Sequence, residues 1–373
     1  MHKPGVRART VAKALVVALA MATTTVYGQS GELEDLVEAA KSEPATTVYA
    51  VTGKIVDTAE AFSAKYGLQV TGKKVNEAGQ VDLLIREHQA GNVAGSVSLA
   101  SDASVIIADL LGQGVVESWV PEDIVGELPE SARNPLVVVS DPHVWAYNSA
   151  AYEACPISNI WQLTDAEWSR RVALMDPLDK PAYADWFNQL ALHHDDAVAA
   201  AYEAYYGKPF DTTTGSATQA WVKAFAANSP LIGDSDVVTQ AIGVAEQEQP
   251  FFGMLSTAKF RDNASKGFKL KICAGMQPFS GWLYPGLGVI ATGTSSPNTA
   301  KLFIHYLLTE EGIDPQRIDG KVPSDPRIGL PADEASGVSA VMDQLMVWDT
   351  SSAVADIDAR QDWQDTWRMS LTR

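Results

Sequence analysis

Sequence motifs of the common hydrolases and nucleotide-binding enzymes are missing from this chain of 373 residues. It contains no G-x-S-x-G nucleophile elbow, no H-E-x-x-H zinc motif and no G-x-x-x-x-G-K-S/T phosphate loop. Residues 286–293 share only the first G-x-G of a dinucleotide fingerprint, and their third glycine is misplaced. These absences favour a binding protein over an enzyme. A hydrolase stays an alternative, although no nucleophile–base pair is recognisable.

Cysteine is scarce, and Cys155 and Cys273 are the only two. In an oxidising compartment such a pair can form a disulfide, and two buried free thiols are the alternative. The pair is a poor metal site because neither cysteine has a second ligand at short spacing. The run of histidine and aspartate at 193–196 is no better, because adjacent side chains on a helix point about 100° apart. We therefore expect no metal site and no cofactor.

Long hydrophobic runs are also absent. The apolar stretch Ala14–Ala22 is shorter than the roughly 20 residues of a membrane-spanning helix. It follows a basic segment and precedes the small residues Val26 and Gly28, which is the pattern of a secretory signal peptide. No cysteine follows that site to carry a lipid anchor. The sequence predicts a signal peptide over 1–28, cleaved near Gly28, and a soluble periplasmic protein.

Basic residues are heavily outnumbered. The chain has 28 Lys and Arg against 46 Asp and Glu, a formal net charge of −18. Loss of the signal peptide, which holds four of the basic residues and no acidic one, makes the charge −22. Such a surface repels nucleic acid and anionic membranes, so we expect no nucleic-acid partner. An anionic ligand is still possible, because a local group of donors can bind it.

Short apolar strands alternate with amphipathic helices along the chain, which predicts an α/β fold. The early part of the chain shows the pattern most clearly. The strands are expected at 46–53, 68–75 and 96–102, and the helices at 31–42, 54–67, 78–91 and 103–114.

Two longer extended stretches, 134–152 and 268–293, interrupt this alternation. The chain is longer than one compact core usually holds, so we interpret them as crossings between two domains. The predicted first lobe is 29–145 plus 280–373, and the second is 146–279. Two crossing strands make a hinge, and the cleft between two hinged lobes is a usual place for a small ligand.

Motifs of one known family occur in order along the chain. Residues 297–312 carry a Pro-Asn start, an apolar helix and a Glu-Gly ending, and 145–177 carry Tyr-Asn, then Pro, Trp and Leu-Thr. Together with 34–50 and 61–70, they resemble the ferric-type solute-binding proteins of ABC importers. The resemblance implies a type II two-lobe periplasmic binding fold that closes on a small-molecule ligand. It also implies delivery to an ABC permease in the inner membrane and no bond chemistry, and we expect a monomer.

The best-known branch of that family binds ferric iron with two adjacent tyrosines at the end of a strand in the second lobe. At about the matching place, this chain has Ser256 and Thr257 after the apolar residues 251–255. Fe³⁺ needs anionic oxygen ligands, which neutral hydroxyls replace poorly. The leading prediction is therefore a small oxygen-rich organic anion, such as a sugar phosphate, a phosphonate or a carboxylate. A ferric-iron carrier with a rebuilt site is the alternative.

Candidate donors for such an anion lie where loops enter helices, the places that face the cleft in the related family. Hydroxyls, backbone N–H groups and helix N-termini all favour oxyanions. The same residue types are ordinary helix N-caps, so each position has a structural alternative. The candidates are Thr52, Gly53, Lys54, Ser101, Ser104, Lys180, Ser235, Ser256 and Thr257.

Overall fold

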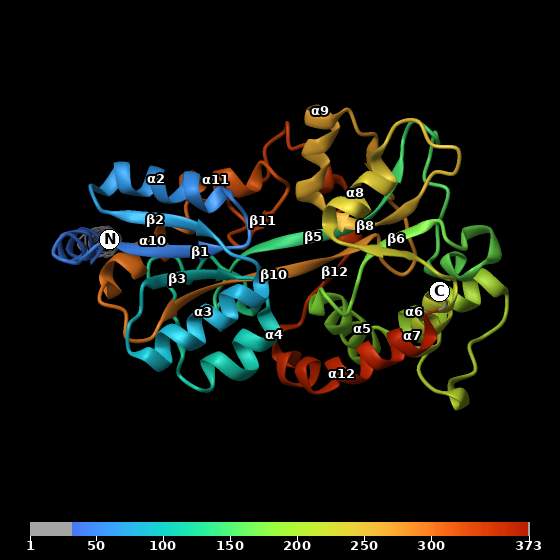
Figure 1. Ribbon diagram of the computed structural model, residues 1–373, viewed down its shortest axis with the longest axis horizontal. Helices are drawn as coiled ribbons and strands as arrows, with labels where there is room; N and C mark the ends of the chain where they lie inside the picture. The colour runs from blue at the N-terminus through green and yellow to red at the C-terminus, as the bar shows by residue number, and fades with distance from the viewer. Residues whose placement is uncertain (1–31, 372–373) are drawn as a thin grey trace, which may run out of the picture.

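A computed structural model describes residues 32–371, and the predicted signal peptide lies outside them. One mixed sheet runs through the described chain, with helices on both of its faces (Figure 1). Its strands are β1 (Thr46–Ala50), β2 (Val70–Lys74), β3 (Gly95–Ala100), β4 (Val116–Ser118), β5 (Val137–Asn148), β6 (Val172–Met175), β7 (Leu231–Gly233), β8 (Phe252–Ser256), β9 (Leu270–Ile272), β10 (Gly281–Ala291), β11 (Val322–Pro323) and β12 (Leu345–Val347).

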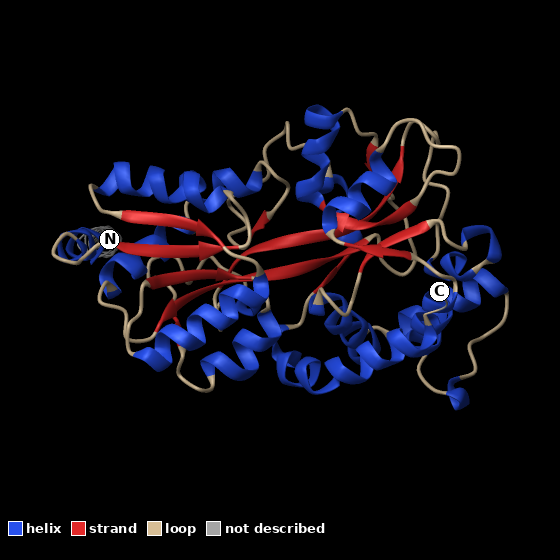
Figure 2. Cartoon of the chain, in the orientation of Figure 1, coloured by secondary structure: helices blue, strands red, loops and turns tan. Residues whose placement is uncertain are grey.

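The main path of the sheet is β2-β1-β3-β10-β5-β8-β6-β7. Figure 2 shows the long central strands β5 and β10 running through the middle of the molecule and linking its two halves. The first half of β5 pairs with β11 and its second half with β8 and β9. Strand β10 likewise pairs with β12 at its start and with β3 and β4 at its end. This arrangement confirms the α/β fold with two crossing strands.

Helices cover the sheet at both ends of the molecule. A first helix spans 32–40, and none of the helices in residues 32–371 is long and apolar enough to cross a membrane. The others are α2 (Lys54–Tyr66), α3 (Glu77–Ala90), α4 (Ala103–Val105), α5 (Pro181–His193), α6 (Asp195–Tyr206), α7 (Ala217–Ala227), α8 (Ser235–Gly243), α9 (Asp262–Lys266), α10 (Pro297–Leu307), α11 (Glu310–Arg317) and α12 (Ala353–Ser370).

The first lobe repeats a strand–helix–strand unit, and nearby residues in the sequence determine where its helices end. Strands β1, β2 and β3 are parallel, as such units require. Helix α2 ends where predicted, because Gly67 adopts the left-handed conformation (φ 70°) and its N–H donates to the carbonyl of Ser63. Helix α2 then buries Ile55, Ala59 and Phe62 against the sheet.

The second lobe is built around tryptophan. Strands β6, β7 and β8 are parallel, and helix α8 packs on all three. The Trp145 ring stacks on Phe252, and the Trp186 ring stacks on Trp282. These tryptophans belong to the largest buried apolar cluster of the protein. They therefore serve as core residues of this lobe.

Two segments differ from the prediction. The extended stretch expected over 268–293 is two strands, β9 and β10, separated by a turn that contains the cis bond between Gln277 and Pro278. The C-terminal helix α12, which we counted with the first lobe, packs mainly on α5 and α7 from the range of the second. Its buried Trp363 and Trp367 contact Phe187 of α5. The other predicted lobe boundaries stay a prediction.

The two cysteines form a disulfide in the structure, with their Cα atoms 5.2 Å apart. The bridge closes a loop with a sequence separation of 118 residues. It joins the segment after β5 to the segment after β9, and Cys273 is fully buried. Of the two alternatives left open by the sequence, the disulfide is therefore the one found.

We predict that the double variant Cys155→Ser, Cys273→Ser is less stable than the native protein by about 2–4 kcal/mol, because a bridge restricts the unfolded chain. Urea unfolding followed by circular dichroism measures this difference. Adding a reductant should lower the midpoint of the native protein and leave that of the variant unchanged. Equal midpoints for the oxidised native protein and the variant would contradict the prediction.

Candidate functional site

The two groups of parallel strands point their carboxyl ends at each other. Strands β1, β2 and β3 end toward the second lobe, and β6, β7 and β8 end toward the first, because each group is parallel within itself and antiparallel to a crossing strand. Ligands of open α/β sheets bind outside the carboxyl ends of the strands. The cleft between the lobes is therefore the candidate site.

A small cavity lies in this cleft beside the crossing strands. It has room for about one water molecule, with a volume of about 10 Å³. A ligand larger than a water molecule therefore requires this space to widen. The residues that line the cavity are Ala50, Val51, Thr52, Leu99, Ser101, Val139, Asp141, Tyr284, Pro285, Gly286, Gln316 and Lys321.

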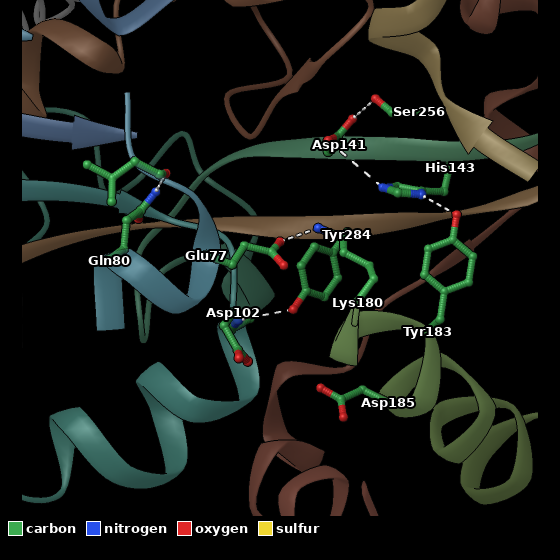
Figure 3. Close-up of polar contacts among 12 residues, drawn as sticks. Glu77, Gln80, Asp102, Asp141, His143, Lys180, Tyr183, Asp185, Ser256 and Tyr284 are labelled. Carbon is green, nitrogen blue, oxygen red and sulfur yellow. Dashed lines mark hydrogen bonds and ion pairs between the residues drawn. The ribbon is translucent and has the colours of Figure 1, made fainter. Parts of the chain in front are cut away.

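Asp141 lies in the middle of β5, and its carboxylate lines the cavity (Figure 3). Its carboxylate accepts a 2.6 Å hydrogen bond from Ser256 and lies 3.8 Å from the ammonium of Lys321. Burial alone would raise the pKa of Asp141, but Lys321 and the other donors outweigh it and hold the pKa below its usual value. The side chain is therefore ionised at neutral pH.

His143 lies two residues further along β5 and faces Tyr183, whose hydroxyl is 3.1 Å from the His143 Nδ1 atom. Its ring stacks on Trp282. Burial lowers the pKa of His143 to about 4, although the nearby Asp141 opposes that shift. His143 is therefore neutral at physiological pH, and the charge of Asp141 is balanced by Lys321.

Three ion pairs connect the two lobes. On one side, Lys180 before α5 pairs with Glu77 at the start of α3, as Figure 3 shows. Close to it, Arg360 of α12 donates to Asp102 at 2.9 Å. On the other side, Arg261 after β8 pairs with Asp319 after α11 at 2.6 Å. The closed arrangement is therefore stabilised by the protein's own charges.

Arg360 also holds a carboxylate within its own lobe. Two of its guanidinium nitrogens donate to Asp185 of α5, at 2.8 and 2.6 Å. Asp185 is fully buried, and burial raises its pKa even though Arg360 opposes the rise. The guanidinium thus bridges Asp102 of the first lobe and Asp185 of the second.

The predicted donors divide into three groups. Thr52 and Ser101 line the cavity, and Lys180 reaches the cleft but pairs with Glu77. Ser104 is fully buried in α4, near Asp185.

The remaining candidates outside β8 lie at helix starts and do not line the cavity. Gly53 and Lys54 begin α2, and Ser235 begins α8 beside its N-cap Asp234. The structure therefore places Thr52 and Ser101 in the cavity wall and leaves Gly53, Lys54 and Ser235 outside it, while Lys180 lies at the cleft in its pair with Glu77.

The hydroxyls of Ser256 and Thr257 have internal roles. Ser256 accepts a hydrogen bond from the backbone N–H of Ala258, as an N-cap does, while it donates to Asp141. Thr257 is buried and donates to the carbonyl of Gly320, so it joins the two lobes. Both residues lie at the cleft, where the tyrosine pair of a ferric relative was expected. They hold the carboxylate and the opposite lobe in place.

Apart from Lys180, sequence reasoning missed the charged residues of the cleft. Asp141 left a signal, because an acidic residue inside a long apolar strand is unusual unless it is paired. Asp102 directly follows the predicted candidate Ser101. The sequence around Lys321 and Arg360 contains no such signal, because their partners are distant in the chain.

Oxygen ligands are numerous in the cleft, but they do not form a preassembled metal site. Glu77, Asp102, Asp141 and Asp185 are each paired with a lysine or an arginine. Among residues 32–371 no group of three or more His, Cys, Asp or Glu side chains is placed to hold an ion. The phenol of Tyr284 accepts a 3.3 Å hydrogen bond from the N–H of Ala103, and burial raises its pKa well above the usual value.

Comparisons with known proteins agree with this architecture. The model of a family described as bacterial extracellular solute-binding protein matches residues 46–320. No curated protein sequence matches the chain significantly.

Several solved structures share the fold. The iron-bound HitA of Pseudomonas aeruginosa has 15% identity and a TM-score of 0.65, over 86% of this chain and 99% of that one. The substrate-binding protein of an ABC transporter from Agrobacterium tumefaciens has 13% identity and a TM-score of 0.65, over 89% and 95%. A Trichodesmium protein in complex with iron and citrate ligands has 13% identity and a TM-score of 0.60, over 88% and 99%.

The matched family is one of solute-binding proteins, and the solved structures share its fold. The matched segment covers most of the described chain and includes both crossing strands. The chain therefore belongs to the bacterial extracellular solute-binding proteins, and it has the two-lobe fold of these solved structures.

Proposed function

We propose that this protein captures ferric iron together with a small oxygen-rich anion and carries both to an ABC permease in the inner membrane. The observation that carries the proposal is the mixed charge of the cleft. Four carboxylates and three cationic side chains form ion pairs at the cleft, and the pair Asp141 and Lys321 lines its cavity.

The carboxylates support the metal part of the proposal. Fe³⁺ prefers anionic oxygen ligands, and Asp141 and Glu77 reach the cleft from the hinge and the first lobe. Because residues 32–371 contain no ready group of three acidic, His or Cys ligands, the metal needs further oxygen donors from outside the chain. An anion bound with the metal supplies them.

The cationic side chains support the anion part. Lys180, Lys321 and Arg360 each face a carboxylate in the closed protein. When a ferric ion binds the carboxylates, their former cationic partners are free to bind an anion. No charge then stays unpaired in the closed cleft. The similar folds of iron-bound HitA and of a protein with iron and citrate ligands agree with this pairing.

The sequence analysis placed an organic anion first and ferric iron second. The similarity to ferric-binding proteins supports the iron alternative better, and the combined ligand keeps the donors that suggested an anion. We further propose that the protein acts as a monomer and that the signal peptide is cleaved near Gly28 during export.

Isothermal titration calorimetry and visible absorption test the proposal. Ferric citrate should bind tightly and in a 1:1 ratio, while citrate without iron binds at least 10-fold more weakly. Ferric nitrilotriacetate, which carries iron on a different chelator, tests whether citrate itself is needed. If citrate binds equally well with and without iron, the metal has no role in the site and the proposal fails.

An organic anion without metal is the second candidate, because the cleft contains three cationic groups on the side chains of Lys180, Lys321 and Arg360. A thermal-shift screen of sugar phosphates, phosphonates and carboxylates in the presence of a chelator tests it. A shift that persists without iron would favour this candidate.

A further inference from the structure

Gln316 is an unassigned polar residue in the wall of the cavity. It lies in the last turn of α11, is fully buried and lines the cavity beside Lys321. Neither its amide oxygen nor its amide nitrogen has a hydrogen-bond partner among residues 32–371. It is also the only cavity-lining residue in that described range with a buried unpaired side-chain atom.

An unpaired buried amide costs the folded protein free energy, and such groups are rare in native proteins. An apolar side chain of similar size at position 316 would avoid the cost. Because the amide lies in the cavity wall, it can form hydrogen bonds with a ligand bound there. Its NH₂ group and its carbonyl oxygen supply donors and an acceptor that no protein group in the described range occupies.

The surroundings of Gln316 indicate what binds there. Thr52 and Ser101 present hydroxyls to the same cavity, and Lys321 presents an ammonium. The ammonium attracts an anionic oxygen. A carboxylate can only accept hydrogen bonds and would leave the acceptor oxygen of Gln316 unpaired, whereas a hydroxyl both donates and accepts. The complementary ligand therefore has a hydroxyl next to an anionic group.

We propose that Gln316 contacts the ligand and selects a hydroxycarboxylate over a carboxylate that lacks the hydroxyl. This inference rests on the proposed function, because it specifies the anion that accompanies the metal. A site built to bond a hydroxyl discriminates against the analogue without it, because its own polar groups are then left unpaired.

The test compares citrate with tricarballylate, which has the same three carboxylates and no hydroxyl. Each is titrated with Fe³⁺ into the native protein, into Gln316→Met and into Gln240→Met, a control at an exposed position on α8. We expect the preference of the native protein for citrate to fall at least 10-fold in Gln316→Met and to stay unchanged in the control. Any difference in how the two anions chelate iron is common to all three proteins and cancels.

Thermal melting of the ligand-free proteins provides an independent measurement. Gln316→Met should melt at or above the temperature of the native protein, because it loses an unpaired buried amide. A lower melting temperature would show that the amide is bonded inside the folded chain and would overturn the inference. Unchanged citrate preference in Gln316→Met would overturn it too, with the proposed function intact. If the native protein binds no ferric complex, the proposed function and this inference both fail.

Discussion

Replacing Arg360 by methionine is expected to destabilise the protein by about 3–5 kcal/mol, the usual cost of removing one partner from a buried ion pair. The side chain is mostly buried and holds two carboxylates at once, Asp102 and Asp185. Methionine keeps much of the apolar contact and removes only the charge and the donors. Asp185 is then left fully buried without its cation. Urea unfolding at pH 7 measures the loss.

The loss should depend on pH. Burial already raises the pKa of Asp185, and without Arg360 only the nearby hydroxyl of Ser104 opposes that rise. A carboxyl whose pKa is higher in the folded than in the unfolded state is penalised once it ionises, and the penalty grows as pH rises above the unfolded pKa of about 3.9. The variant should therefore lose most stability near pH 7 and progressively less toward pH 4.

Two further variants make this prediction specific. Arg368→Met, on the same helix, removes an exposed arginine that pairs with the exposed Asp365, and it should cost less than about 1 kcal/mol. The double variant Arg360→Met, Asp185→Asn should recover much of the stability, because the uncompensated charge is gone. A loss in Arg360→Met that is the same at pH 4 and pH 7 would show that Arg360 acts through packing alone.

The parts of the fold that the sequence predicted depend on local signals. Gly67 and Gly91 end helices α2 and α3 because both residues adopt positive φ angles. The β-branched run before Asp141 marks the crossing strand, because it has neither helical period nor turn residues. Such signals act within a few residues, so they determine the individual helices and strands and the order in which these follow along the chain.

The charges of the site could not be predicted because their partners are distant in the chain. Arg360 meets Asp185 across 175 residues and Asp102 across 258. The sequence near Arg360 is that of an ordinary amphipathic helix. Its two partners come within reach only after α12 packs on α5. The roles of Ser256 and Thr257 could not be predicted for a different reason. A hydroxyl before a helical turn looks the same whether it caps the turn, orients a carboxylate or binds a ligand.

Replacing Asp141 by asparagine is expected to weaken the binding of ferric citrate by about 1,000-fold. The change keeps the size of the side chain and its contact with Ser256, but it removes the negative charge nearest the cavity. Truncating one member of a buried charge pair costs about 2–5 kcal/mol of binding, and 1,000-fold corresponds to about 4 kcal/mol. Calorimetric titration of both proteins with ferric citrate measures the change.

The same variant separates the metal from its anion. Lys321 loses its carboxylate partner in Asp141→Asn, so citrate without iron should bind as well as before or more tightly. Asp236→Asn is the control, because Asp236 pairs with Lys259, is largely exposed and does not line the cavity. It should leave both affinities unchanged. Equal losses for ferric citrate and for citrate alone would mean that Asp141 shapes the hinge without contacting the metal. The cleft would then bind an anion, with its carboxylates serving to hold the closed lobes together.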